Sequence, residues 1–494
     1  MQYTPGLLNI DKNHCSPVYL QIANGIISHI QQGKLKPAAP LPSSRILASA
    51  LNVHRNTVVA AYDELYAQSW VDVFPRKGIF VASNLPEVSS RPINTDVRQD
   101  GYPTKTYFEI NEHKMPAADF FKEGPAQNIN INTGMPDTRL APIELMVREY
   151  RRFAGHQSTH KYLMYGPEQG SLNLRTELAI FLGETRGLQV TAEDILITKG
   201  AQMAIYLAAQ VLLSKNDIVI AANPGYGGAN EIFEHAGAKL ELVPVDEQGM
   251  DIDAVEAICK KKKVKMLFVI PHHHQPTTVT LSSDRRMQLL ELAKKYRFAI
   301  IEDDYDYDFH YSSTPILPLA SADYYGSVIY VGSFCKTIAP GIRIGFMIAP
   351  RNLITQATRL RRLIDRQGEQ LLEEAVANLL RNGDISRHLK KANKIYHERR
   401  DVLCRLLQEK LGDQVSFKIP DGGFAIWVKF LNGITPSQLM EKTAGMGLTI
   451  TDCGDYYYKA ACEQPYMRLG FASLNVAELV TVVDIMKRAI DKLT

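Results

Sequence analysis

The chain has 494 residues, of which 45% are hydrophobic and 22% are charged, and its formal net charge is +3. This composition is ordinary for globular proteins, and the length suffices for two or three domains. No apolar run reaches about 18 residues, and the first residues show no signal-peptide pattern, so we expect a cytoplasmic protein without a membrane partner. The six cysteines are scattered without a C-x-x-C pair, which argues against a disulfide framework or a zinc site.

The charge is placed unevenly along the chain. Residues 1–82 hold seven Lys and Arg against four acids, so this stretch alone accounts for the net charge of +3. A weakly basic segment joined to a neutral remainder suggests an anionic partner for that segment.

The first 82 residues predict three helices followed by a hairpin. Apolar residues recur at helical spacing after Ser16 and Pro17 in "SPVYLQIANGIISHIQQGKL". The stretch "PSSRILASALNVHRNTVVAAYDELYAQS" predicts two helices that break at Asn52 and Val53. Then "WVDVFPRKGIFVA" predicts two short strands joined by a basic turn. This order is that of a winged helix-turn-helix domain over residues 1–82, and four residues of its second helix should face inward, namely Ile46, Leu47, Ala50 and Leu51.

Residues 83–124 lose this periodicity. The stretch is polar and contains several prolines and serines, as in "SNLPEVSSRPINTDVRQDGYPTKTY". We therefore predict a linker over 83–124.

Residues 125–494 alternate between buried strands and helices. The apolar runs "DIVIAANPGY", "VKMLFVIPHHHQP", "FAIIEDDYDYDF" and "SVIYVGSFCKT" all become polar at their C-terminal ends. Such strands are typical of a parallel sheet covered on both faces, whose ligands bind at the carboxyl ends of the strands. Residues 355–411 are mainly helical and 412–494 predict a smaller α+β part. We expect a smaller subdomain over about 360–494, together with the start of the domain.

These strand ends bring together the groups that one cofactor needs. Lys336 lies in "GSFCKTIAPGIRIGF", seven residues before Arg343. Upstream strand ends carry "EDDYDYDF", "HHHQPTT" and "NPGYGG", and Gly200 leads from another strand into a helix whose free N–H groups suit an anion. Pyridoxal 5'-phosphate requires a lysine for its aldehyde, a carboxylate for its ring nitrogen and donors for its phosphate. The sequence therefore predicts a pyridoxal phosphate site.

The motifs around this site resemble a known family. The pattern S-x-x-K followed by P-G-x-R-x-G over residues 333–345 is similar to that of fold-type I aminotransferases. The whole chain resembles the MocR/GabR group of GntR-type regulators, which join a winged helix-turn-helix to such a domain. The resemblance covers nearly all of the chain. It implies an N-terminal winged helix-turn-helix, mostly α with a β wing, and an α/β fold-type I aminotransferase-like domain with a smaller α+β subdomain.

The resemblance assigns roles to residues of the cofactor site. Lys336 would form an aldimine with pyridoxal phosphate, and Asp303 would pair with the pyridinium. Asp304 is the alternative, because strand alternation turns the two carboxylates to opposite faces. Tyr305 would donate to the ring hydroxyl, and Tyr226 would stack on the ring, unless it only packs there. The remaining cofactor contacts would come from Gln275, from the phosphate ligands Ala201, Gln202, Ser333 and Arg343, and from Tyr165 of the partner subunit.

Two more residues would contact an amino-acid ligand. Arg468, in "YMRLGF", resembles the arginine that binds a substrate α-carboxylate, a task suited to its planar fork. Gly134, in "NTGMPD", would lie beside the same ligand. Arg468 could instead be the structural partner of an acid.

Residues 125–494 depart from the family pattern at four positions. Gln275 stands where asparagine is usual, and Thr278 replaces a glycine. Asn223 replaces an acidic residue, and Cys335 precedes the lysine where serine or a similar residue is usual. These changes concern the tuning of the lysine more than the binding of the cofactor.

The first 82 residues resemble the DNA-binding head of GntR-type regulators. The helix that starts near His54 would enter the major groove with its N-terminal residues at the base edges. Arg45 and Arg55 could instead pair with acids on a solvated surface. The predicted DNA contacts are Arg55, Asn56 and Thr57 on the reading helix, Ser43, Ser44 and Arg45 before it, and Arg76, Lys77 and Gly78 at the wing tip.

The run His272–His274 invites a metal hypothesis, which we reject. Neighbouring residues on a strand point to opposite faces, so three in a row cannot all ligate one ion. We predict no metal site.

Three functions remain compatible with the sequence. The first is a transcriptional regulator that binds operator DNA and uses its pyridoxal phosphate domain to sense an amine or amino-acid effector. The second is a working aminotransferase that carries a DNA-binding domain, and the third is a sensor of pyridoxal phosphate itself. We favour the first, as a homodimer with or without domain swapping, because fold-type I sites are shared between subunits.

Overall fold

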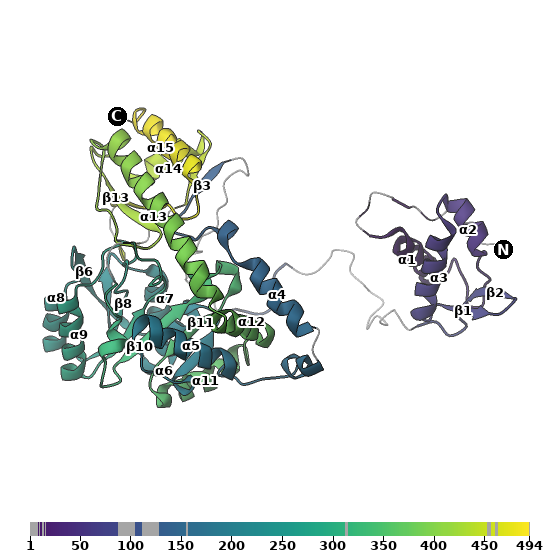
Figure 1. The fold of residues 1–494 in the computed structure, drawn as a ribbon, viewed down its shortest axis with the longest axis horizontal. Helices are drawn as coiled ribbons and strands as arrows, with labels where there is room; N and C mark the ends of the chain where they lie inside the picture. The colour runs from purple at the N-terminus through teal and green to yellow at the C-terminus, as the bar shows by residue number, and fades with distance from the viewer. Residues whose placement is uncertain are drawn as a thin grey trace. The chain divides into compact units, whose positions relative to one another are not determined.

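A computed structural model describes residues 8, 10–11, 14, 16–86, 104–110, 128–154, 157–311, 315–451, 456–459 and 463–493 (Figure 1). The chain divides into two compact units, Met1–Glu112 and His113–Thr494. Most of the predicted linker 83–124 lies outside the described residues.

The first unit contains the three helices and the hairpin that its sequence predicts. Helices α1 (Val18–Gln31), α2 (Ser44–Leu51) and α3 (Arg55–Ala67) precede the antiparallel strands β1 (Val71–Phe74) and β2 (Gly78–Val81). The Ser43 side chain accepts a hydrogen bond from the Ile46 N–H and so caps α2, which ends at Asn52 in a left-handed conformation. A core formed by α1, α2, α3 and the hairpin includes Ile22, Ile26, Leu47, Val58, Leu65 and Trp70.

The prediction for α2 was wrong at two positions. Ile46 is 61% exposed and Ala50 is also exposed, whereas Leu47 and Ala48 are buried. The helix has only eight residues, and its inward stripe is narrower than four apolar positions would require.

The second unit is built on an eight-stranded sheet in the order β4-β11-β10-β9-β8-β5-β6-β7. Strands β5, β6, β8, β9 and β10 are parallel, as predicted. Strand β11 pairs antiparallel with β10, and β4 pairs antiparallel with β11 at the end of the sheet. The strands are β4 (Ile195–Thr198), β5 (Ile218–Asn223), β6 (Lys239–Asp246), β7 (Gly249–Met250), β8 (Val264–Val269), β9 (Ala299–Asp303), β10 (Val328–Ser333) and β11 (Gly345–Ile348).

Helices cover this sheet and bury its apolar side chains in separate core clusters. Figure 1 shows α8 and α9 side by side near β6 and β8. The helices are α4 (Ile143–Ala154), α5 (Leu172–Arg186), α6 (Ala201–Leu212), α7 (Gly227–His235), α8 (Ile252–Lys261), α9 (Ser283–Tyr296), α10 (Phe334–Thr337), α11 (Arg351–Ile364), α12 (Gln370–Arg381) and α13 (Asp384–Leu411). Short 3-10 turns lie at Thr138–Leu140, Gln157–Leu163, Ala192–Asp194, Leu319–Ala322 and Pro340–Ile342.

A smaller α+β part completes the second unit. Its three-stranded antiparallel sheet has the order β12-β13-β15, and a separate parallel pair joins β14 to β3 from the start of the unit. The 28-residue helix α13 packs against α15 of this part and against α12. The elements are β3 (Ile129–Ile131), β12 (Val415–Phe417), β13 (Ala425–Phe430), β14 (Leu448–Ile450), β15 (Tyr466–Gly470), α14 (Pro436–Ala444) and α15 (Val476–Ile490).

Within the described part of the chain, no helix combines the length and apolar character needed to cross a membrane.

Candidate cofactor and DNA-binding sites

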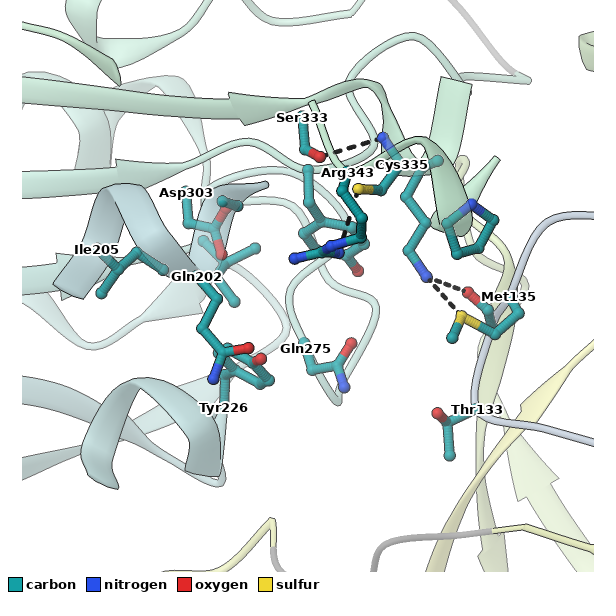
Figure 2. A pocket seen from close by; sticks show the side chains of 16 residues that line it. Thr133, Met135, Gln202, Ile205, Tyr226, Gln275, Asp303, Ser333, Cys335 and Arg343 are labelled. Carbon is teal, nitrogen blue, oxygen red and sulfur yellow. Dashed lines mark hydrogen bonds between the residues drawn. The ribbon is translucent and has the colours of Figure 1, made fainter. Parts of the chain in front are cut away.

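A cavity of about 270 Å³ lies at the carboxyl ends of the parallel strands (Figure 2). In the view of Figure 2, Asp303 and Tyr226 lie on one side of this space and Met135 lies on the other, with Gln275 between the two sides. Thirteen of its lining residues end or follow strands of the large sheet, and three precede α4. The lining is Thr133, Gly134, Met135, Ala201, Gln202, Ile205, Tyr226, Ile270, Gln275, Asp303, Tyr305, Ser333, Cys335, Lys336, Pro340 and Arg343.

Lys336 sits in the four-residue helix α10, directly after β10. Its Nζ donates to the Gly134 carbonyl at 2.8 Å and to the Met135 Sδ at 3.3 Å. Burial, together with the nearby positive charge of Arg468, lowers the pKa of Lys336 to about 8. The amine is therefore neutral in a much larger fraction of molecules near neutral pH than a solvent-exposed lysine.

The three consecutive acids at the end of β9 have different surroundings. Glu302 accepts hydrogen bonds from the Leu319 and Ala320 N–H groups, and Asp304 accepts one from the Tyr330 hydroxyl at 2.8 Å. Asp303 alone lines the cavity, and its Oδ1 has no hydrogen-bond partner. Burial and two neighbouring aspartates raise the pKa of Asp303 to about 8. The alternation of the strand thus puts Asp303, and not Asp304, in the cavity.

The start of α6 and the segment after β10 meet at one end of the cavity. Ala201 and Gln202 open α6 after Gly200, whose φ of 87° suits glycine. A Cβ at Gly200 would lie 2.7 Å from Arg343 Nη2, so a side chain there would displace this guanidinium. Arg343 Nη2 donates to the Lys199 carbonyl at 2.7 Å, and the Ser333 hydroxyl donates to the Ile344 carbonyl at 3.3 Å. Helix N–H groups, a guanidinium and a hydroxyl thus face one small volume, which favours an anion there.

Three more of the predicted cofactor residues line the cavity. Tyr226 precedes α7, and Gln275 lies in the loop after β8. The Tyr305 hydroxyl donates to the His273 carbonyl at 3.0 Å and accepts from Arg468 Nη2 at 3.2 Å. The phenol is thus held at the wall of the cavity by two polar groups.

Arg468 and Tyr165 do not line this cavity. The Arg468 guanidinium is 1% exposed and donates to the carbonyls of Thr133 and Pro276 at 2.8 and 2.9 Å, besides its contact with Tyr305. Tyr165 is 76% exposed, and its ring lies 4.2 Å from the Arg366 guanidinium carbon. Gly134, the other predicted ligand contact, lines the cavity at a φ of 111°.

The sequence did not single out several cavity residues. Met135 contacts the lysine amine. Cys335, which the sequence marks only as a departure from the family pattern, accepts at its Sγ from Arg343 Nη1 at 3.4 Å. Met135 directly follows the predicted Gly134, so its place at the site could have been predicted from that position. The apolar residues Ile205 and Ile270 have no such feature in the sequence.

The three consecutive histidines have three separate partners. His272 Nδ1 lies 3.0 Å from Asp304 Oδ1, and His273 Nδ1 lies 2.9 Å from Asp306 Oδ1. His274 Nδ1 lies 2.8 Å from the Thr277 hydroxyl, and burial lowers the pKa of His274 to about 3.

The predicted DNA contacts lie on the surface of the first unit. Arg55 begins α3 and its Nε donates to the Ser44 hydroxyl at 3.4 Å, so the starts of α2 and α3 are adjacent. Neither Arg45 nor Arg55 forms an ion pair with any residue that the structure describes. Asn56 is exposed and Thr57 is half-buried, and the wing tip of Arg76, Lys77 and Gly78 is exposed between β1 and β2.

The two units match two protein-family models. Residues 127–485 match aminotransferase class I and II, and residues 18–81 match the gntR family of bacterial regulatory proteins. The chain is 30% identical to YisV of Bacillus subtilis, an uncharacterized helix-turn-helix-type transcriptional regulator, over 94% of each chain. It is 26% identical to the probable rhizopine catabolism regulatory protein MocR of Rhizobium meliloti, over 95% of this chain and 93% of that one.

The chain belongs to the MocR-type transcriptional regulators of the gntR family. The second unit of this MocR-type regulator also resembles solved aminotransferases. A kynurenine aminotransferase of Pyrococcus horikoshii, solved in complex with PMP, superimposes with a TM-score of 0.70 at 28% identity, over 74% of this chain and 92% of that one. The regulator is therefore a DNA-binding protein with a fold-type I domain, and its cofactor is pyridoxal phosphate.

The cavity of the MocR-type regulator fits this cofactor. The unpartnered Oδ1 of Asp303 can accept a hydrogen bond from the ring N–H of the cofactor. Gly200 has no side chain, which leaves room for the phosphate beside Arg343. When bound, the cofactor supplies an aldehyde carbon that a primary amine can attack and a ring that withdraws electrons. Lys336 is the cavity's amine, and its lowered pKa favours the neutral, nucleophilic form.

Attachment of the cofactor should depend on pH through Lys336. Because the pKa of the buried amine is about 8, its neutral fraction rises about tenfold between pH 7 and pH 9 and then levels off. We expect the rate at which visible absorbance develops after mixing apoprotein with pyridoxal phosphate to follow this curve. Lys336→Ala should develop no such absorbance, while Asp303→Asn should keep the same midpoint. A rate that keeps rising towards pH 10.5 would contradict the lowered pKa.

Arg55 should determine DNA sequence recognition. Loss of a base contact costs about 1–3 kcal/mol, so Arg55→Ala should weaken operator binding about 10- to 100-fold and relax its specificity. Arg45→Ala is the matched control, because loss of a phosphate contact should weaken binding to all sequences alike. Fluorescence anisotropy with specific and unrelated duplexes measures both effects. Normal operator binding by Arg55→Ala would show that α3 is not the reading helix.

Proposed function

We propose that the aminotransferase-like unit senses an amine or amino-acid effector and thereby controls operator binding by the winged-helix unit. The observation that carries this proposal is the cavity itself. It keeps Lys336, Asp303 and Arg343 together around a pyridoxal phosphate site, in a chain that also carries a DNA-binding head. The roles given above to the individual cofactor residues belong to this proposal.

The effector competes with Lys336 for the aldehyde carbon of the cofactor. An effector that carries a carboxylate would also take over hydrogen bonds of Arg468, which now go to backbone carbonyls and Tyr305. Arg468 lies on β15 of the smaller part, and its acceptors lie in three other segments of the second unit. A carboxylate is a stronger hydrogen-bond acceptor than a carbonyl, so a bound carboxylate would replace the hydrogen bonds by which Arg468 joins these segments.

A titration of the holoprotein with a panel of amines and amino acids tests the proposal. We expect one compound to shift the visible band of the cofactor without producing a keto acid, and to change operator affinity. By linkage, operator DNA must change the affinity for that compound by the same factor. A band that no amine shifts, although pyridoxal phosphate alone changes operator affinity, would favour a cofactor sensor. A band that bleaches and is restored by a keto acid would favour a working aminotransferase.

We also propose that the regulator is a homodimer. Helix α4 exposes Ile143, Val147 and Tyr150 at helical spacing, and the exposed Leu163, Met164 and Tyr165 follow in the chain. Contiguous exposed apolar residues of this kind are typical of protein interfaces. The outward position of Tyr165 is compatible with a contact in the cofactor site of a partner subunit.

Charges placed on the α4 stripe should separate the subunits. We expect Ile143→Asp with Val147→Asp to sediment as a monomer and to bind pyridoxal phosphate more weakly than the wild type. Met287→Asp is the matched control, because Met287 is a similarly exposed apolar side chain on α9. If the double variant sediments as the wild type does, the interface lies elsewhere.

A further inference from the structure

Ten basic side chains gather at one edge of the large sheet. The strands β5, β6, β8, β9 and β10 are parallel neighbours, so the segments that precede them meet at the amino edge of the sheet. Five segments, 213–217, 236–241, 256–265, 291–297 and 323–327, make up this edge. We call it the basic edge, and its cations, all exposed, are Lys215, Lys239, Lys260, Lys261, Lys262, Lys263, Lys265, Lys294, Lys295 and Arg297.

The basic edge is a concentration of charge in an otherwise neutral part of the chain. Its five segments contain ten Lys and Arg against five acids, a net charge of +5. Since residues 83–494 are neutral in sum, everything else in that stretch carries a net charge of −5. Such segregation produces a positive field at one edge that attracts an anionic partner.

Most of these cations have no acidic partner. Glu256 pairs with Lys260 and Lys295, and Glu241 pairs with Lys262. The other seven form no ion pair with any residue in the described part of the chain. Asp323 is occupied locally, because its carboxylate accepts the Tyr325 and Val328 N–H groups. The edge is therefore not a network of mutually neutralised charges.

Exposed aromatic residues extend the basic edge. Tyr324 is 89% exposed and Tyr325 is 64% exposed, in the segment before β10. The Tyr325 ring lies 4.3 Å from Lys294 Nζ. Tyrosine hydroxyls interspersed with lysines are suited to the sugar and phosphate groups of a nucleic acid.

We infer that the basic edge is a second DNA-binding surface, which grips the phosphate backbone of DNA outside the sequence read by the winged-helix unit. Five strands at about 4.8 Å spacing span about 19 Å, which faces about eleven duplex phosphate charges. Because both units belong to one chain, DNA bound by the first unit has a raised effective concentration for the second. The cofactor cavity lies at the opposite, carboxyl edge and stays accessible. This inference does not depend on the nature of the effector.

The test compares two DNA lengths at several salt concentrations. An operator is first selected from random-sequence DNA with the intact holoprotein. Binding is then measured to a short duplex limited to the selected site and to a long duplex with about 30 additional base pairs on each side. The variant combines Lys261→Gln, Lys263→Gln and Lys265→Gln, which form no ion pairs among the described residues. The matched control combines Lys390→Gln, Lys391→Gln and Lys394→Gln on α13, all exposed.

The expected result is specific to the long duplex. Each lost phosphate contact lowers the slope of log K against log salt by about 0.9, so the variant's slope should fall by about 2 to 3. Its affinity for the long duplex at low salt should fall on the order of 10-fold, whereas binding to the short duplex and the cofactor absorbance should not change. An unchanged slope on the long duplex would overturn the inference and favour an acidic protein as partner. Equal losses on both duplexes, or equal losses in the α13 control, would also overturn it.

Discussion

The main constraint on the second unit is that it buries an amine and a carboxyl group in one cavity, with no hydrogen bond between them. Removal from water favours the neutral form of each, which lowers the pKa of Lys336 and raises that of Asp303, both to about 8. Such groups are costly unless the surrounding structure is stable enough to hold them. Extensive apolar clusters on the faces of the large sheet supply that stability. The reactive groups are therefore poised for a ligand that brings a complementary N–H and an electrophilic carbon.

The parallel sheet explains why residues so distant in sequence share one site. Each parallel strand ends at the same edge, so the segments after β5, β8, β9 and β10 deliver Tyr226, Gln275, Asp303 and Lys336 to a common space. The two antiparallel strands β11 and β4 bring Arg343 against the start of α6. At Gly345 a Cβ would lie 2.5 Å from the Gly200 carbonyl carbon, so the two backbones touch. A side chain at Gly345 would therefore push β11 away from the start of α6.

Much of this arrangement could be predicted from sequence, because it follows from period and spacing. Strand alternation separated Asp303 from Asp304, and the polar ends of the apolar strands located the cavity that Lys336 lines. The hydrogen bonds of Arg468 could not be predicted, because the acceptors are backbone carbonyls in loops far away in the chain. The burial of the short helix α2 was misjudged at Ile46, since apolar residues alone do not tell which face of a two-turn helix meets the core. The contact of Met135 with the lysine amine likewise depends on a loop conformation that no periodicity encodes.

Helix α13 connects the smaller part of the second unit to the segment that carries Lys336. At 28 residues and about 1.5 Å per residue it is a rod of about 42 Å. Near its start, His388 Nε2 lies 2.9 Å from the carbonyl of Thr337, the residue after the reactive lysine. Further along, Arg400 Nη1 donates to the Pro420 carbonyl of the smaller part at 2.9 Å. The two contacts are about 18 Å apart along the helix, so a tilt of a few degrees at the smaller part would shift the segment beside Lys336 by about 1 Å.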